Sequence, residues 1–157
     1  MAVVEAQGET MNHFRAILTA TALAAVALPV SASENVRLVL KGYDPVAYFT
    51  ESKPVKGDAK YSYDWDEGRY HFASARHRDM FAGNPDKYAP QFGGYCTGSM
   101  SRGVRNEGDP EGWTIKDGRL YVFGAAKAKA VAESDPQYLP SRLDNAKKHW
   151  QERRSGS

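Results

Sequence analysis

Two segments, each made of two strand-like runs around a short turn, constrain the fold most. Residues 61–65 alternate aromatic and polar side chains, and residues 69–72 resume the alternation after a turn at 66–68. An apolar run also lies on each side of residues 116–119, which contain Asp-Gly. A period of two is typical of half-buried strands, and Asp-Gly between such runs favours a tight turn. The sequence therefore predicts two β-hairpins.

The segments around the hairpins predict helices. Ser74 can cap a helix over residues 75–82, which Gly-Asn-Pro closes, and Pro85 can open a short turn. Further helices are expected over residues 125–133 and 140–153, and a short strand over 36–40. No internal repeat and no long linker is apparent, and 157 residues suffice for one ordinary domain. The expected fold is α+β: a compact single domain with two β-hairpins, several short helices and a C-terminal helix.

Residues 1–32 resemble an export signal. A short basic start at Met11 leads into an apolar run that ends in Val30-Ser31-Ala32, where small residues suit cleavage. We expect Met11 to be the true start, because two glutamates precede it, and residues 33–157 to form the mature domain. The expected location is periplasmic or secreted. The alternative, retention as an anchor, is less favoured because the apolar run is shorter than the roughly 20 residues that span a bilayer.

Charge and cysteine content exclude several classes of function. The chain carries 21 Lys and Arg against 19 Asp and Glu, a formal charge of +2. This balance argues against a nucleic-acid binder that relies on bulk charge. A single cysteine excludes an internal disulfide and any zinc site that needs two cysteines of one chain.

Several motifs in sequence order resemble the YHS domain family, in particular its longer, exported members. The resemblance spans roughly residues 42–150. The motifs are Gly42-Tyr43-Asp44-Pro45-Val46-Ala47-Tyr48-Phe49, Tyr70-His71-Phe72-Ala73-Ser74, Arg78-Asp79-Met80-Phe81, Asn84-Pro85-Asp86-Lys87-Tyr88 and Pro90-Gln91-Phe92-Gly93-Gly94-Tyr95-Cys96.

The resemblance implies a small domain related to treble-clef-like, metal-binding modules. In the short, metal-binding members three cysteines occupy positions that correspond here to Ala47, Ala73 and His77. The usual metal site of the family therefore does not carry over to this chain.

Cys96 is the sharpest candidate for chemistry. A thiolate at Cys96 and the thioether of Met100 form a soft pair suited to Cu(I), and His77 or His71 could supply a nitrogen ligand. On this interpretation the protein is a non-enzymatic exported module that binds a soft metal ion, copper first. The expected partner is that metal ion or an exported protein.

Two other interpretations stay open at this point. In the first, the protein is a structural or protein-interaction domain and Cys96 is a buried core thiol, with Met100 as core filler. In the second, Cys96 is the nucleophile of a thiol-dependent enzyme, activated by a neighbouring basic residue. The histidines have ordinary alternatives as well: His71 as a cross-strand or surface residue, and His77 as a hydrogen-bonded residue at the edge of the core.

Overall fold

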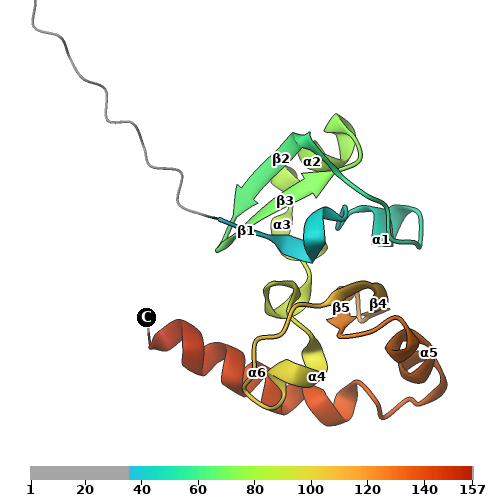
Figure 1. Ribbon diagram of the computed structural model, residues 1–157, viewed down its shortest axis with the longest axis vertical. Helices are drawn as coiled ribbons and strands as arrows, with labels where there is room; N and C mark the ends of the chain where they lie inside the picture. The colour runs from blue at the N-terminus through green and yellow to red at the C-terminus, as the bar shows by residue number, and fades with distance from the viewer. Residues whose placement is uncertain (1–35, 157) are drawn as a thin grey trace, which may run out of the picture. The chain divides into compact units, whose positions relative to one another are not determined.

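A computed structural model of the chain describes residues 36–156. The expected signal segment, residues 1–32, lies outside the described residues. The fold is α+β, as predicted, and Figure 1 shows its short strands and helices. The elements in chain order are β1 (Arg37–Leu38), the 3₁₀ helix η1 (Val39–Gly42), α1 (Ala47–Thr50), β2 (Asp58–Trp65), β3 (Gly68–Phe72), α2 (Ala75–Gly83), α3 (Pro85–Tyr88), the 3₁₀ helix η2 (Gln91–Gly94), α4 (Thr97–Met100), β4 (Asp109–Lys116), β5 (Arg119–Phe123), α5 (Lys127–Ser134) and α6 (Pro140–Ser155).

Both predicted hairpins are confirmed. Strands β2 and β3 pair antiparallel, and β1 adds a parallel edge, which gives the strand order β1-β3-β2. Strands β4 and β5 form a separate two-stranded sheet. The alternating residues indeed bury one face: along β3, Tyr70 and Phe72 are at most 2% exposed, while His71 between them is half-buried.

The helices also begin and end close to the predicted residues. The Ser74 hydroxyl accepts a hydrogen bond from the His77 backbone N–H at 3.2 Å, so Ser74 caps α2 as expected. The prediction of a strand over residues 36–40 is wrong beyond Leu38. Leu40 and Lys41 have φ angles of 52° and 51°, and this left-handed backbone turns the chain out of the sheet.

The chain contains a structural repeat that the sequence pattern did not predict. We call residues 39–90 the first half-unit and residues 91–140 the second. Each half-unit begins with a 3₁₀ helix, η1 or η2, that contains residues with left-handed backbone. A one-turn helix, a β-hairpin and a longer helix then follow in the same order. The hairpins have strands of equal length, with a register irregularity at the same place. The counterparts Asp58 and Asp109 are 51 positions apart.

The backbone hydrogen bonds repeat as well. The N–H of Asp44 donates to the Val55 carbonyl at 2.8 Å, and the N–H of Cys96 donates to the Asn106 carbonyl at 2.8 Å. An isolated antiparallel bridge precedes the hairpin in each half-unit, between Tyr43 and Lys56 and between Tyr95 and Glu107. Cys96 therefore occupies the position in the second half-unit that Asp44 occupies in the first.

The two half-units differ in what fills their cores. The first core is aromatic and centres on Phe81, which is fully buried and contacts several rings. The second contains Met100, alanines of α5 and α6 and six aromatic side chains, of which three are buried. Helix α2 contacts β2 and β3, whereas α5 contacts β4 and α6 contacts α4 and η2, and Figure 1 shows these as separate groups of elements.

The repeat predicts matched effects at two equivalent glycines. A Cβ atom on Gly57 would lie 2.5 Å from the His71 carbonyl carbon, and one on Gly108 would lie 2.6 Å from the Val122 Cγ2 and 2.7 Å from the Gly94 carbonyl oxygen. Since each Cβ would meet a backbone atom, we expect Gly57→Ala and Gly108→Ala each to lower the free energy of unfolding by about 2 kcal/mol or more.

Gly83 is the control for this prediction, because a Cβ there would meet nothing within 4 Å. Gly83→Ala should be neutral or stabilise by up to about 1 kcal/mol. Urea denaturation of the three variants provides the measurement. Equal stability of all three variants would contradict the predicted clash, and a cost at only one of Gly57 and Gly108 would contradict their equivalence.

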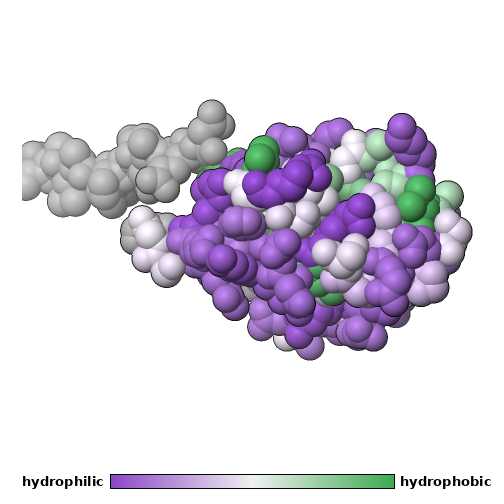
Figure 2. Space-filling view, turned by 90° about the horizontal axis from the view of Figure 1, so that it is seen from below, coloured by the Kyte–Doolittle hydropathy of each residue, from purple (hydrophilic) through white to green (hydrophobic). Residues whose placement is uncertain are grey.

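The described surface is predominantly polar. The face in Figure 2 is mostly hydrophilic, with only scattered apolar residues. Among residues 36–156 the exposed large hydrophobic side chains are Leu38, Val104 and Val131. No helix within this range combines the length and the apolar character that crossing a bilayer requires.

Candidate functional site

Cys96 and Met100 lie one helical turn apart at the two ends of the short helix α4. The Met100 N–H donates to the Cys96 carbonyl at 2.8 Å. Cys96 is 7% exposed, and its sulfur lies 3.5 Å from the place that a Cβ on Gly124 would occupy. Met100 is fully buried in the core of the second half-unit. The two sulfur-bearing residues of the predicted site are therefore neighbours in the structure, and both are buried.

His77 belongs to a different group of side chains. Its Nδ1 donates to Oδ2 of Asp44 at 2.6 Å, and its Nε2 lies 3.5 Å from the Thr50 hydroxyl. The Asp44 carboxylate is fully buried and also accepts backbone N–H bonds from Val46 and Ala73, both at 2.8 Å. A carboxylate that fixes one ring nitrogen and leaves the other available is typical of histidine ligands and histidine bases, and equally of a histidine that joins two segments.

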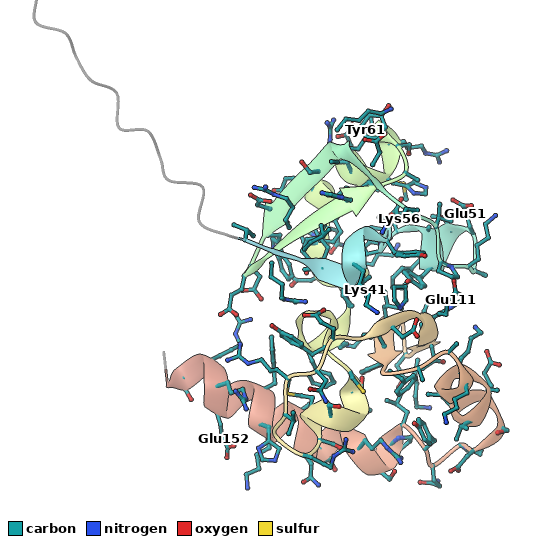
Figure 3. All side chains as sticks on the ribbon, viewed as in Figure 1. Lys41, Glu51, Lys56, Tyr61, Glu111 and Glu152 are labelled. Carbon is teal, nitrogen blue, oxygen red and sulfur yellow. The ribbon has the colours of Figure 1, made fainter. Side chains whose placement is uncertain are left out.

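His71 lies on β3 with its ring beside η1. Its Nδ1 would be 3.3 Å from a Cβ on Gly42, and the Lys56 ammonium is close to the same glycine. Burial lowers the pKa of His71, and the nearby positive charges of Arg69 and Lys56 lower it further. Lys56 also donates to the Lys41 carbonyl, and Figure 3 labels both lysines. Both effects favour the neutral form of the His71 imidazole.

Cys96 and Met100 are neighbours in the structure, but neither predicted histidine forms a contact with Cys96. His77 is bonded to Asp44 in the first half-unit, and no contact links either His71 or His77 with Cys96. Within residues 36–156 no group of three or more His, Cys, Asp and Glu side chains is arranged to hold a metal ion. A copper site at Cys96 and Met100 stays a prediction.

The repeat explains the setting of Cys96. In the first half-unit, Asp44 directs its carboxylate at the backbone N–H of Ala73, just after the hairpin. In the second, Cys96 directs its sulfur at Gly124, which follows the hairpin at the equivalent position. A thiol thus replaces a buried carboxylate, and the histidine that pairs with the carboxylate has Ala128 as its counterpart.

A groove lies between the first hairpin turn, η2 and α6; we call it the Trp150 groove. It consists of two adjoining cavities of about 80 and 180 Å³ that share Asp66, Gly93 and Trp150. Three of its charged residues, Arg37, Asp66 and Arg154, form ion pairs. Arg154 contacts Asp66 at 2.6 Å, and Arg37 contacts Glu107 at 3.0 Å. These ion pairs connect distant parts of the chain and leave the groove with little net charge.

A further cavity of about 200 Å³ lies between β4, α5 and the start of α6. We call it the Ala132 cavity. Thr114 and Lys116 of β4 line it together with Ala132 of α5 and Leu139. It is comparable in volume to a small ring compound and lies within the second half-unit alone.

Comparisons of the chain with protein-family models, with curated proteins and with solved structures found no match. The resemblance to the YHS family therefore stays a prediction from motifs.

Sequence reasoning missed Asp44 and the Ala132 cavity. Asp44 precedes a proline in a turn, where aspartate is ordinary, and its bonds to Ala73 and His77 span 29 and 33 positions. Ala132 lies in an Ala- and Lys-rich segment that indicates only a helix. The recurrence of Gly-Tyr and of Gly-Asp in the two half-units was the available signal for the repeat.

Proposed function

We propose that the protein is a non-enzymatic, exported structural or protein-interaction domain in which Cys96 is a core thiol. The observation that carries this proposal is the position of Cys96: it is 7% exposed and replaces the structural carboxylate of Asp44 in the repeated framework. Residues in such positions contribute to stability more than to chemistry.

The surroundings of Cys96 agree with this role. A sulfur nucleophile needs access to substrate and a neighbouring base, and among the described residues no side chain forms a hydrogen bond or ion pair with the Cys96 sulfur. His77, whose ring is held by the buried Asp44 carboxylate, lies in the other half-unit.

Copper binding is the second candidate function. One observation favours it: the Met100 N–H bond to the Cys96 carbonyl fixes the thiol and the thioether one turn apart on α4. Two soft ligands on one turn suit Cu(I), which accepts low coordination numbers. In this case Cys96 and Met100 would form the site, without His71 or His77 unless the fold rearranges.

The substitution Cys96→Ala separates these candidates. If Cys96 is a core thiol, the variant should lose about 1 kcal/mol of unfolding free energy, because a small buried side chain leaves a small cavity. Its Cu(I) content should equal that of the unsubstituted protein. Thermal unfolding and a Cu(I) competition titration under reducing conditions provide the two measurements.

The control is Met100→Leu, which keeps the volume of the core and removes the thioether. If the unsubstituted protein binds Cu(I) stoichiometrically and either variant does not, the copper candidate is right and the core-thiol proposal is wrong. Equal Cu(I) behaviour of all three proteins supports the proposal.

A further inference from the structure

The Trp150 groove brings two partly uncovered indole rings to one cavity. Trp65 of β2 and Trp150 of α6 both line the larger of its two cavities, and both side chains are half-buried. Phe92 of η2 packs against Trp150, with ring centres 6.4 Å apart and ring planes at 74°. Flat apolar surface from two elements that are distant in the sequence therefore meets at this cavity.

Unused hydrogen-bonding groups surround the same cavity. The side chains of Asp86, Gln91 and Arg119 line it and form no hydrogen bond or ion pair within residues 36–156. Asp66 and Arg154, which also line it, pair with each other at 2.6 Å. A carboxylate accepts hydrogen bonds, a guanidinium donates them, and an amide does both. The cavity thus offers donors and acceptors that the protein does not use itself.

The signs of these charges indicate a ligand without net charge. An anionic ligand would meet the Asp86 carboxylate in the larger cavity and the Glu67 carboxylate in the smaller one. A cationic ligand would meet the Arg119 guanidinium. Like charges at short range are unfavourable where water is partly excluded. A neutral hydroxyl group both donates and accepts, so a ligand with several hydroxyl groups can satisfy Asp86 and Arg119 together.

The volumes indicate a ring with an extension. An apolar cavity of about 150 Å³ holds a six-membered benzene ring. The larger cavity of the Trp150 groove measures about 180 Å³ and the smaller about 80 Å³. Trp150 and Gly93 line both cavities, and Gly93 has no side chain that could separate them. A ligand with one ring in the larger cavity can therefore continue into the smaller one.

We infer that the Trp150 groove binds a neutral saccharide, with one pyranose ring in the larger cavity and part of the next sugar in the smaller one. The C–H face of a pyranose is apolar and suits an indole surface, while its hydroxyl groups suit Asp86, Gln91 and Arg119. This inference goes beyond the proposed function, because the ligand is a small molecule and Cys96 does not line the groove.

The test is a titration of the purified protein with cellobiose, maltose, lactose and N,N′-diacetylchitobiose, followed by calorimetry and by tryptophan fluorescence. At least one disaccharide should bind one-to-one with a Kd of about 1 mM or below. The methyl glycoside of its non-reducing sugar should bind at least about fivefold more weakly, since it leaves the smaller cavity empty. Fluorescence should change on binding, because two of the three tryptophans line the groove.

Three substitutions locate the site. Arg119→Gln and Asp86→Asn should each weaken binding of that disaccharide at least about fivefold, because each removes a charged hydrogen-bonding group. Trp150→Ala should weaken it at least about tenfold by removing the indole. Asp86 and Arg119 are exposed, so their variants keep the test valid if Trp150→Ala fails to fold.

Lys116→Gln is the matched control. Lys116 is the cross-strand neighbour of Arg119 but lines the Ala132 cavity and not the Trp150 groove. The substitution therefore removes one positive charge from the same end of the hairpin, and the variant should bind the disaccharide as the unsubstituted protein does.

Two results would overturn the inference: binding of none of the four disaccharides, or binding that the folded Arg119→Gln and Asp86→Asn variants retain unchanged. Either result leaves the core-thiol proposal standing, because that proposal is tested by Cu(I) binding and by the stability of Cys96→Ala. Conversely, Cys96-dependent copper binding would refute that proposal without changing the saccharide result.

Discussion

Replacing Asp44 with alanine should lower the free energy of unfolding by about 3–5 kcal/mol, the largest effect that we expect from one polar side chain. The carboxylate is fully buried and accepts backbone N–H bonds from Val46, Ala47 and Ala73 as well as the His77 ring N–H. Alanine leaves these donors without an acceptor inside the protein, and each buried unpaired donor costs about 1–3 kcal/mol. Urea denaturation measures the loss.

The repeat supplies a matched control for this prediction. Cys96→Ala changes the equivalent position in the second half-unit, where the sulfur carries no hydrogen bond between residues 36 and 156, and should cost only about 1 kcal/mol. Asp44→Asn keeps the shape and one acceptor oxygen, so its cost should lie between the two. If Asp44→Ala is at least as stable as Cys96→Ala, the buried carboxylate does not organise the first half-unit.

Phe81→Ala should cost about 3–5 kcal/mol, because it removes the ring at the centre of the first core. The variant places alanine at position 81, and the equivalent residue of the second half-unit, Ala132, is already alanine. We therefore expect Phe81→Ala to gain binding of a neutral ring compound such as indole, since the surrounding aromatic rings remain. Calorimetric unfolding with and without indole measures both effects.

The reverse substitution provides the comparison. Ala132→Phe adds a ring to a cavity of about 200 Å³ and should leave the melting temperature unchanged or raise it. A large loss of stability in Ala132→Phe together with a small loss in Phe81→Ala would contradict the assignment of these two residues to equivalent positions.

The hairpins and the longer helices could be predicted because their signals are local. Alternation along β2 and β3, the Asp-Gly turn before β5 and the Ser74 cap each involve residues a few positions apart. The strand expected over residues 36–40 failed because Leu40 and Lys41 adopt left-handed backbone, which apolar residues rarely signal.

The sequence pattern did not predict the repeat, because the two half-units share a backbone arrangement but not their core residues. Gly-Tyr and Gly-Asp recur at the turns that need them, as in Gly57-Asp58 and Gly108-Asp109. The core positions diverged, so that a residue such as Phe81 has alanine as its counterpart. Backbone equivalence therefore became apparent only from hydrogen bonds and strand register.

The candidate site was predictable only in part for the same reason. Cys96 and Met100 were paired for the chemistry of their sulfur atoms, and the structure places them one helical turn apart. Whether His71 or His77 joined them depended on tertiary contacts, and the strongest of these, from His77 to Asp44, spans 33 positions. A cavity arises where side chains leave space unfilled, so no sequence motif predicts the Ala132 cavity.

The central claim is that Cys96 is a core thiol at the position that Asp44 occupies in the first half-unit. Thermal unfolding of Cys96→Ala, together with a Cu(I) competition titration of the variant and the unsubstituted protein, tests this claim most directly. We predict a loss of about 1 kcal/mol of unfolding free energy and the same Cu(I) behaviour in both proteins. Stoichiometric Cu(I) binding by the unsubstituted protein that Cys96→Ala abolishes would contradict it.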